Sequence, residues 1–349
     1  MTTTMKKTMM IASIVVISLF LVLPVEGFTT PARTILRDAS SSVNNFLLAE
    51  SSSTNDEGNS IDRRSFLHKA PCAAAVAIGM ASATNIVTPP AAMAAIDVKK
   101  VAVAGATGQT GRRILERLAS SGKGWSVIGG VRNVDKASES LSKSSTVIRG
   151  AMVQSVASVD TSAVLLQRLN VVDDSVDTMA TTLKGVDGLV IATGFIPGNP
   201  LKMNAAAHEV DNIGTIRLID AAKKAGVKKV VLVSSILTNG RAWGQEKSPG
   251  FLITNAFGGV LDEKLVAEKY LRSSGLDYTI VRPGGLKAKP ATGELKISTE
   301  DTLNSGEISR DLVADVCVAS LTDPKASNKV LEIIEDDGTP PKAFNGLVM

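Results

Sequence analysis

Three glycines follow a short apolar run in the stretch VAVAGATGQTGRRIL, from Val101 to Leu115. The run Val101–Ala104 is β-branched at alternate positions, which is typical of a strand buried on both faces of a parallel sheet. Gly105, Gly108 and Gly111 come directly after it. Glycine adopts the φ values of a tight turn at low cost, and its missing side chain lets a diphosphate approach the backbone. The spacing therefore predicts a dinucleotide site.

The helix that follows this turn strengthens the prediction. Ile114, Leu115 and Leu118 mark its buried face, and its N-terminal amides and positive dipole end would face the anion. A glycine pattern alone also fits an ordinary strand-to-helix turn, but the strand before it and the helix after it favour the cofactor site. The residues expected to bind the cofactor here are Gly105, Ala106, Thr107, Gly108, Gln109, Thr110 and Gly111.

Arg132 follows the second predicted strand, Trp125–Val131, at the position that distinguishes the two nicotinamide dinucleotides. An acidic residue there would bind the ribose hydroxyl of NAD, whereas an arginine pairs with the 2′-phosphate of NADP. Arg132 therefore favours NADP over NAD, and a solvated arginine at a strand end is the alternative. Arg112 and Arg113, on the first helix, are weaker candidates for the same role.

Strands and helices continue to alternate through the rest of the chain. A long helix is expected through Asp211 and Asn212 to Ala225, and Ser309 is expected to cap a helix that ends near Leu321. Five further strands are predicted, at Leu165–Val171, Gly188–Ala192, Lys228–Ser235, Asp277–Arg282 and Lys329–Ile334. This order predicts an α/β fold with a single doubly wound parallel-sheet Rossmann domain.

Ligands of such sheets bind at the carboxyl ends of the strands. Asp173 follows the third strand, where it either hydrogen-bonds an adenine edge or caps the helix that opens at Ser175. Further site residues expected at these ends are Ala192, Thr193, Gly194, Ser234, Ser235, Pro283 and Gly284. Two long connections interrupt the alternation. The Ser-rich Ser138–Ser162 is expected to be a surface excursion, and Ile236–Phe257 is either a lid over the site or a packed loop.

Few residues are available for metal or triad chemistry. Cys72 and His68 lie in an N-terminal segment that reads as targeting sequence, which leaves Cys317 and His208 for the folded part. One cysteine and one histidine allow neither an intramolecular disulfide nor a Cys/His zinc site, so no metal is expected. The helical pattern around His208 favours a structural histidine over a catalytic one. Cys317 is expected to fill the core.

Charge and aromatic content argue against a nucleic-acid partner. The chain has 38 Lys and Arg against 34 Asp and Glu, and the first 95 residues hold seven of the basic and six of the acidic ones, so the remaining charge is about +3. Lysines and arginines are scattered, and aromatic residues make up 3% of the chain. Neither a phosphate-tracking stripe nor a stacking platform is visible.

The first 95 residues resemble targeting signals. Lys6 and Lys7 precede the apolar run Met9–Leu23, and a small-residue pattern ends before Phe28, which predicts a signal peptide over residues 1–27. The segment resembles the bipartite plastid presequences of algae with complex plastids. That resemblance implies a transit segment and a Ser-rich linker over residues 28–61.

A second signal is expected over residues 62–95. Arg63 and Arg64 begin a twin-arginine pattern, and an alanine-rich stretch ends at an A-x-A site, Ala92–Ala94. The segment resembles signals that carry folded proteins into the thylakoid lumen, which favours the lumen over the stroma. A stromal protein with a fortuitous arginine pair, or a retained membrane anchor, is the alternative. The Rossmann domain is then expected over residues 96–349.

Four segments of the expected domain resemble the atypical short-chain dehydrogenase/reductases: GATGQTG, GGVRNVDKA, VDNIGTIRLIDAAKKAGVKKVVLVSS and AEKYLRSSGLDYTIVRPGGL. Within that superfamily the chain is most similar to plastid NAD(P)-binding proteins of the Tic62 and NmrA-like group. The resemblance implies that the glycine turn holds the diphosphate and that Arg132 holds the 2′-phosphate. It also implies that the fifth-strand serines and the Pro283-Gly284 turn flank the nicotinamide.

The resemblance further implies a Tyr-x-x-x-Lys pair, in which the lysine lowers the pKa of the tyrosine for proton transfer. Lys264 occupies the lysine position, where it would also contact the nicotinamide ribose, but Val260 stands four residues before it. Neither tyrosine of the chain recreates the pair. Tyr270 has the wrong helical phase relative to Lys264, and Tyr278 alternates into the core.

Two functions remain open from the sequence. The first is an NADPH-dependent reductase of a small apolar carbonyl, enone or quinone, in which Lys264 or a bound water relays the proton. The second is a non-catalytic NADP(H) redox sensor or assembly factor for thylakoid complexes. The expected partners are accordingly a small-molecule substrate or a thylakoid protein, with membrane association that is at most peripheral.

Overall fold

The computed structural model describes residues 97–143, 145–149, 152–156 and 158–341, together with 344, 346 and 347. The targeting signals expected over residues 1–95 lie outside these residues. All of the described residues belong to one compact unit, Pro89–Met349. Within them, each helix is too short or too polar to cross a membrane.

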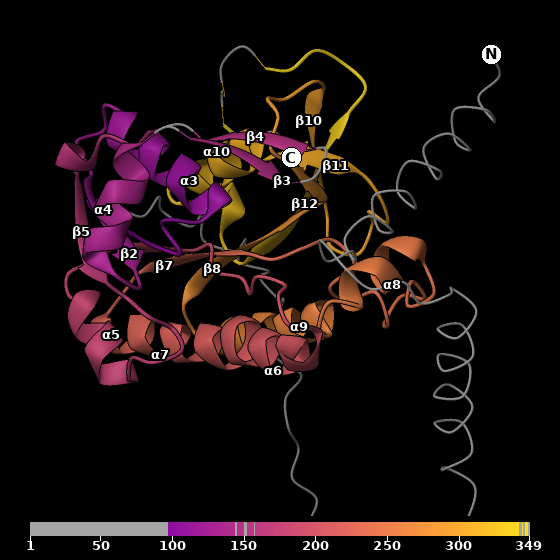
Figure 1. Ribbon diagram of the computed structural model, residues 1–349, viewed down its shortest axis with the longest axis horizontal. Helices are drawn as coiled ribbons and strands as arrows, with labels where there is room; N and C mark the ends of the chain where they lie inside the picture. Colours follow the sequence, from indigo (N-terminus) through magenta and orange to yellow (C-terminus); the bar gives the residue numbers. More distant parts are fainter. Residues whose placement is uncertain are drawn as a thin grey trace, which may run out of the picture. The chain divides into compact units, whose positions relative to one another are not determined.

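The central sheet of the described part has eight strands in the order β10-β12-β8-β7-β6-β1-β2-β5. Figure 1 shows β5 and β2 toward one side of the molecule and β12 and β10 toward the other. Seven strands run parallel, and β10 pairs antiparallel with β12 at one edge. The strands are β1 Lys100–Ala104, β2 Ser126–Val131, β5 Val164–Arg168, β6 Gly188–Ile191, β7 Lys229–Val233, β8 Asp277–Pro283, β10 Glu294–Ser298 and β12 Lys329–Asp336. The predicted parallel α/β sheet is confirmed, and the main difference in bounds is that β5 ends three residues before the expected Val171.

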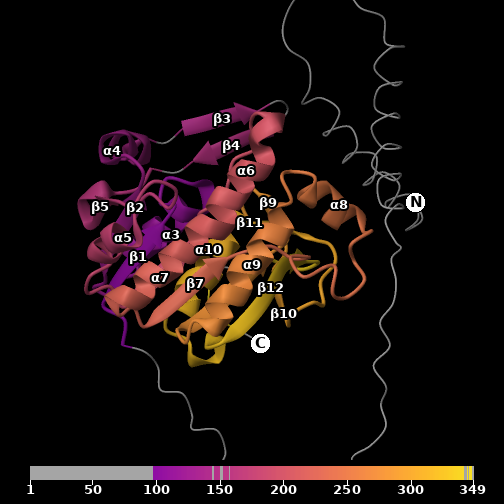
Figure 2. The ribbon, with the colours of Figure 1, turned by 90° about the horizontal axis from the view of Figure 1, so that it is seen from below.

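Helices cover both faces of the sheet, as the alternating side chains of β1 show. Val101 and Val103 pack in one core with α3, α4 and α10, whereas Ala102 and Ala104 pack in another with α5, α7 and α9. The helix bounds are α3 Gln109–Ser120, α4 Val134–Ser142, α5 Val176–Thr182, α7 Thr215–Ala225, α9 Val260–Ser273 and α10 Arg310–Ser320. Figure 2, which views the molecule from below, shows α7 and α9 crossing in front of the strands. The domain is therefore doubly wound, as expected.

The helix expected to run unbroken to Ala225 is interrupted. It consists of α6 (Met203–Ala207), a π-helical segment (His208–Gly214) and α7. The Thr215 hydroxyl donates to the Val210 carbonyl five residues back, at 3.1 Å. A Cβ at Gly214 would lie 2.7 Å from the Glu209 carbonyl oxygen, so the widened turn has no room for a side chain there. Pattern alone does not reveal this π-helical insertion, which turns the buried Asp211 and Asn212 toward α9.

The Ser-rich stretch Ser138–Ser162, expected to be a surface excursion, contains regular secondary structure. Its first residues complete α4, and a separate antiparallel hairpin follows, formed by β3 (Ser145–Arg149) and β4 (Met152–Val156). This hairpin pairs with no strand of the central sheet. The remaining short elements of the described part are η1 Thr161–Ala163, η2 Pro200–Lys202, α8 Pro249–Asn255, β9 Gly285–Lys287, β11 Glu307–Ser309 and η4 Pro324–Ala326.

The connection Ile236–Phe257 has a small core of its own. Ile236, Leu237 and Phe251 are buried together with Leu261 of α9. Arg241 donates to both carboxylate oxygens of Asp262 at 2.8 Å and lies over the Phe251 ring. These contacts fix the connection against α9. The structure therefore matches the packed loop rather than the lid.

A buried ion cluster joins β8, α9 and β12. The Arg282 guanidinium of β8 is fully buried and donates to Glu268 of α9 at 2.6 and 3.1 Å, to Glu332 of β12 at 3.3 Å and to Asp301 at 2.8 Å. Glu332 also accepts from the backbone amides of residues 301–303. Burial lowers the pKa of Arg282, but the hydrogen bonds and charge of Glu268 outweigh it and raise the pKa above its ordinary value.

We expect Arg282→Met to lower the free energy of unfolding by about 3–5 kcal/mol, because the buried carboxylates of Glu268 and Glu332 would lose their cation. Urea denaturation followed by circular dichroism measures this loss. Lys296→Met is the control, since it breaks an exposed pair with Asp336 and should cost less than about 1 kcal/mol. Equal losses in the two variants would contradict the account of the buried cluster.

Candidate cofactor and active site

The glycine turn after β1 is closed on both sides by backbone. Gly105 has φ +81, and a Cβ there would lie 2.7 Å from the Ala192 carbonyl oxygen. A Cβ at Gly111 would lie 2.2 Å from the Gly105 carbonyl oxygen, so α3 approaches the turn as closely as its backbone permits. The Gly108 amide donates to Gly105 at 2.9 Å, and the Ala106 amide donates to Gly130 at 3.2 Å. These bonds hold the turn rigid and leave the amides of the first turn of α3 to face a ligand.

The start of α3 fits an anion. Gly108 provides no side-chain cap, and the first turn contains no acidic residue. At the neighbouring end of β6, the Thr193 hydroxyl is buried and has no hydrogen-bond partner among the described residues. A Cβ at Gly105 would lie 3.0 Å from the Thr193 amide, so the two segments adjoin. An uncapped helix end beside an unsatisfied hydroxyl fits the diphosphate of a dinucleotide.

A pocket of about 430 Å³ opens between the glycine turn and α4. It is lined by Thr107, Val131, Arg132, Asn133, Lys136, Ala137 and Ser140. Arg132 is exposed there, as the assignment to a 2′-phosphate requires. The side-chain oxygen of Asn133 accepts from the Lys136 amide at 2.9 Å and so caps the start of α4. Lys136 therefore lies in the first turn of α4, about one helical turn after Arg132. Sequence reasoning missed Lys136, although its i+4 spacing from Arg132 was a usable signal.

The two arginines of the first helix face different neighbours. Arg113 pairs with Asp311 of α10 at 3.3 Å and donates to the Gln109 carbonyl at 2.8 Å. Arg112 donates to the carbonyl and hydroxyl of Ser140 on α4, at 3.1 and 3.3 Å. Arg113 is thus directed toward α10, on the side of α3 away from the Arg132 pocket.

Asp173 does not cap the helix that opens after it. The Ser175 hydroxyl does so, by accepting from the Thr178 amide at 3.2 Å. The Asp173 carboxylate is exposed and accepts from the Asn170 side chain at 2.6 Å. The prediction that Asp173 caps this helix was therefore wrong, because the Ser175 hydroxyl accepts from the Thr178 amide instead. Its contact with adenine stays a prediction.

Lys264 lies in a buried ion pair that the sequence did not reveal. Its side chain is 17% exposed, and its Nζ lies 2.7 Å from Oδ1 of Asp211, which is 1% exposed. The other oxygen of Asp211 accepts from the Phe195 amide at 3.1 Å. Asp211 therefore links the lysine of α9 to the loop that leaves β6. A carboxylate inside an apolar helical pattern was the only signal for this role.

A second polar chain lies beside the first. The Asn212 side chain donates to Glu263 at 2.7 Å, and the same oxygen of Glu263 lies 3.0 Å from Nδ1 of His208. His208 is about half exposed. Its contacts fit the structural role expected for it. Cys317 is fully buried, and burial raises the pKa of its thiol to about 12, in agreement with its expected place in the core.

Neither tyrosine lies at the position that would pair with Lys264. The Tyr270 hydroxyl donates to Asp220 of α7 at 2.5 Å, and this hydrogen bond raises the pKa of Tyr270. Tyr278 packs against the core between the sheet and α5, α7 and α9. Val260 is the first residue of α9 and packs against the apolar cluster of the Ile236–Phe257 connection. Proton transfer by a phenol beside Lys264 therefore has no residue to perform it.

The remaining predicted residues lie at the carboxyl edge of the sheet. Ser234 is buried, with its hydroxyl 3.3 Å from that of Thr238, and Ser235 is half-buried at the end of β7. A Cβ at Gly284 would lie 2.6 Å from the Gly306 carbonyl oxygen. The Pro283-Gly284 turn is thus packed against backbone, which fixes its direction. Ala192 and Gly194 flank Thr193 in the loop that holds Asp211.

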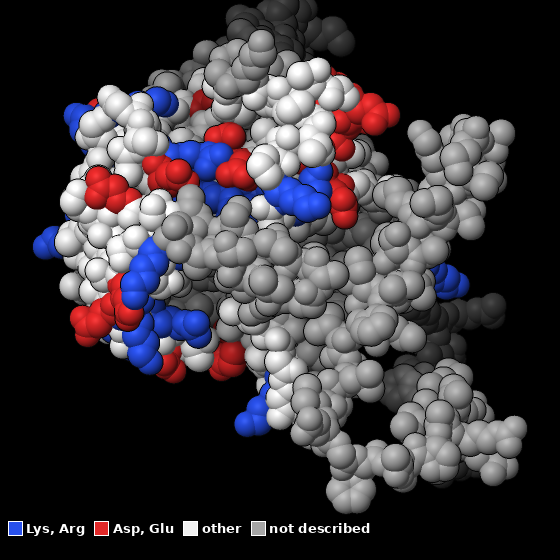
Figure 3. Space-filling model, turned by 45° about the horizontal axis from the view of Figure 1, so that its top comes forward, with Lys and Arg blue, Asp and Glu red and all other residues white. Residues whose placement is uncertain are grey.

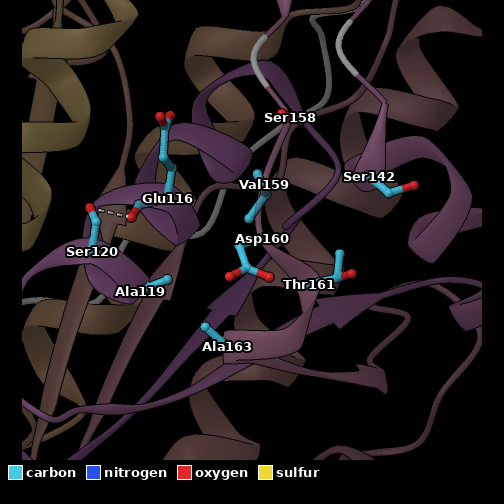
Figure 4. Close-up of a pocket in the computed structure, with 9 residues that line it drawn as sticks. All are labelled: Glu116, Ala119, Ser120, Ser142, Ser158, Val159, Asp160, Thr161 and Ala163. Carbon is cyan, nitrogen blue, oxygen red and sulfur yellow. Dashed lines mark hydrogen bonds between the residues drawn. The ribbon is translucent and has the colours of Figure 1, made fainter.

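A separate pocket of about 580 Å³ lies at the far end of α3 (Figure 4). Glu116 and Ser120 project from α3, while Asp160 and Thr161 come from the segment before β5. Asp160 is already bonded to the amide and hydroxyl of Ser162. None of the predicted site residues lines this pocket. On the face shown in Figure 3, basic and acidic side chains are interspersed over the described surface.

The comparisons with known proteins agree with this geometry. A family model described as NAD(P)H-binding matches residues 105–324. The chain belongs to this family of NAD(P)H-binding Rossmann proteins, within the atypical short-chain dehydrogenase/reductases.

Among its relatives is the uncharacterized chloroplastic protein At2g34460 of Arabidopsis thaliana, 44% identical over 254 residues, which are 72% of this chain and 82% of that protein. The chloroplastic protein TIC 62 of Pisum sativum is 32% identical over 70% of this chain and 44% of its own length. Sanguinarine reductase of Eschscholzia californica is 37% identical over 40% of this chain and 51% of its own length. The oxidoreductase ylbE of Lactococcus lactis shares the fold, with 24% identity, a TM-score of 0.53, and coverage of 69% of this chain and 92% of that one.

If Arg132 binds the 2′-phosphate, Arg132→Ala should weaken NADPH binding about tenfold or more and leave NADH binding unchanged, because NADH lacks that phosphate. Lys136→Ala should act in the same direction with a smaller effect. Titration of the purified protein with each dinucleotide, followed by the fluorescence of the nicotinamide, measures both affinities.

Lys143→Ala is the matched control, since Lys143 lies just beyond α4 and pairs with Glu139 in solvent. Tighter binding of NADH than of NADPH by the unaltered protein would overturn the assignment of Arg132.

Proposed function

We propose that this protein is an NADPH-dependent reductase of a small apolar carbonyl, enone or quinone, with Lys264 as the proton donor. The observation that carries the proposal is the buried pair of Lys264 and Asp211, held against the loop that leaves β6. A reductase without the usual tyrosine needs another positioned acid, and Lys264 is the cation at this place.

The surroundings of the site support an apolar substrate. A Cβ at Gly258 would lie 2.6 Å from the Met203 carbonyl oxygen, so the junction of α8 and α9 adjoins the start of α6. Large apolar side chains are exposed on both segments and on the loop after β6: Ile196, Leu201, Leu252, Ile253 and Phe257. A rim of this kind favours a substrate with an apolar body and a single polar group to be protonated.

Different residues of the chain would bind the cofactor and supply the proton for the reduction. When bound, NADPH would supply the hydride for the electrophilic carbon of the substrate. The glycine turn and the start of α3 hold the diphosphate, and Arg132 and Lys136 hold the 2′-phosphate. Asp211 keeps the Lys264 ammonium at the carboxyl edge of the sheet. There Lys264 donates a proton to the substrate oxygen and is then reprotonated from solvent. Hydride and proton together account for the two-electron reduction.

The relatives support reduction as the reaction class. Sanguinarine reductase is named for reduction of an organic substrate, and its match to this chain supports the same class of chemistry here. The substrate itself follows only from the apolar rim, so a broad screen of aldehydes, enones and quinones is the way to find it.

We expect Lys264→Met to lower kcat by at least about 100-fold at saturating NADPH, because the proton donor is lost. Asp211→Asn should lower kcat less, since the lysine remains but loses its partner. Tyr270→Phe and Tyr278→Phe should retain activity. Oxidation of NADPH, followed at the nicotinamide absorbance band, measures each rate.

Asp220→Asn is the matched control for Asp211→Asn, because it removes a carboxylate of α7 that contacts α9 through Tyr270 and not through Lys264. Full activity in Lys264→Met would refute the lysine as proton donor. Oxidation of NADPH by none of the substrate classes would refute the reductase and favour the redox sensor or assembly factor.

We also propose that the protein works in a plastid. Two of its relatives are described as chloroplastic, and the first 95 residues resemble plastid targeting signals. Delivery to the thylakoid lumen rests on the twin-arginine pattern alone. Protease added to isolated intact thylakoids should leave a lumenal protein undegraded, and its degradation would place the protein outside the lumen.

A further inference from the structure

Among the arginines whose side chains the structure describes, Arg132 and Arg310 have no hydrogen-bond or ion-pair partner in the described part of the chain. Arg132 lines the pocket assigned above to the 2′-phosphate. Arg310 is partly buried, and its Nη1 atom is fully buried without an acceptor. A buried guanidinium donor without an acceptor is costly, so its retention calls for a ligand.

Arg310 is the first residue of α10, which lies alongside α3 (Figures 1 and 2). Arg113 pairs with Asp311, and Arg117 pairs with Asp315, four residues further along in both helices. The equal spacing shows that the two helices run parallel. Their N-termini therefore lie at the same edge of the sheet, and Arg310 is a close neighbour of Arg113 in the second turn of α3.

Arg310 and Arg132 lie on opposite sides of α3. Arg112 contacts Ser140 of α4, which lines the Arg132 pocket, whereas Arg113 contacts α10. The α10 side is also the β6 side of the sheet, since α10 contacts β7 and β8, which follow β6 in the strand order away from β2. A dinucleotide bound across a Rossmann sheet places its adenosine over the β2 side and its nicotinamide over the β6 side. Arg310 is therefore on the nicotinamide side of the diphosphate.

The electrostatic setting of Arg310 agrees with this placement. Burial lowers the pKa of Arg310, and the neighbouring Arg113 lowers it further. The carboxylate of Asp311 is engaged by Arg113 and Arg117. A phosphate would supply both the missing acceptor and the missing negative charge.

We propose that Arg310 binds the nicotinamide-side phosphate of the cofactor diphosphate. This inference rests on the cofactor half of the proposed function and is independent of substrate reduction. Arg310 and Arg132 then act as two separate phosphate contacts, one on each side of the start of α3, and they contribute to affinity for different parts of the same cofactor.

Two ligands separate these contacts: NADPH, and adenosine 2′,5′-bisphosphate, which lacks the nicotinamide-side phosphate. Arg310→Gln should weaken NADPH binding about tenfold to a hundredfold and leave adenosine 2′,5′-bisphosphate binding unchanged, because one charge-assisted contact is lost from NADPH alone. Arg310→Lys should bind NADPH with intermediate affinity. Arg132→Ala should weaken both ligands. Titration calorimetry of the full-length protein measures all of these affinities without any turnover.

Arg217→Gln is the matched control, because it removes one arginine charge from α7, on the other face of the sheet. The unliganded melting temperature of Arg310→Gln should equal or exceed that of the unaltered protein, since the variant relieves a contact between two cations. Unchanged NADPH affinity in Arg310→Gln, or equal weakening of both ligands, would overturn the inference. Weaker NADPH binding in Arg310→Gln without reduction of any substrate would support it and refute the reductase.

Discussion

The site depends on the close approach of α3 to the turn after β1. A Cβ at Gly111 would lie 2.2 Å from the Gly105 carbonyl oxygen, so the helix and the turn meet with only hydrogen between them. This contact brings the free amides of α3 to the carboxyl edge of the sheet, where their partial charges add to the helix dipole. The groups assigned to the phosphates are arranged around it, with Arg132 past β2 and Arg310 at the start of α10.

The proposed chemistry depends on a second feature, the π-helical segment before α7. An unbroken α-helix would have turned Asp211 and Asn212 to different angles, and the insertion directs them to Lys264 and Glu263 of α9. Lys264 is thereby tied to the exit loop of β6 through a carboxylate instead of facing a tyrosine. Arg282 joins α9, which carries Lys264, to β8 and β12 through its bonds to Glu268 and Glu332.

Local sequence patterns predicted most of the fold. The parallel strands, the glycine turn and the cap at Ser309 were predictable, because each rests on a few adjacent residues and strong backbone preferences. Arg132 was placed correctly after β2 for the same reason. The partners of charged residues were not predictable, since the pairs of Lys264 with Asp211 and of Arg113 with Asp311 join residues far apart in sequence.

Two departures show where pattern reasoning ended. The β3–β4 hairpin lies in a Ser-rich stretch whose composition favours a loop. The π-helical segment differs from an α-helix by one inserted residue, which leaves the apolar periodicity almost unchanged. In each case the backbone conformation depends on contacts with residues far away in the sequence, which a short stretch of sequence does not reveal. Lys136 and Asp211, which enter the proposed site, were not predicted, because their positions depend on the exact geometry of α4 and of the π-helical segment.

A crystal structure of the protein with NADPH bound tests the central claim most directly. The account predicts the diphosphate at the start of α3, the 2′-phosphate between Arg132 and Lys136, and the nicotinamide beside Lys264 at the end of β6. A 2′-phosphate remote from Arg132, or a nicotinamide ring on the side of α3 away from Lys264, would contradict it.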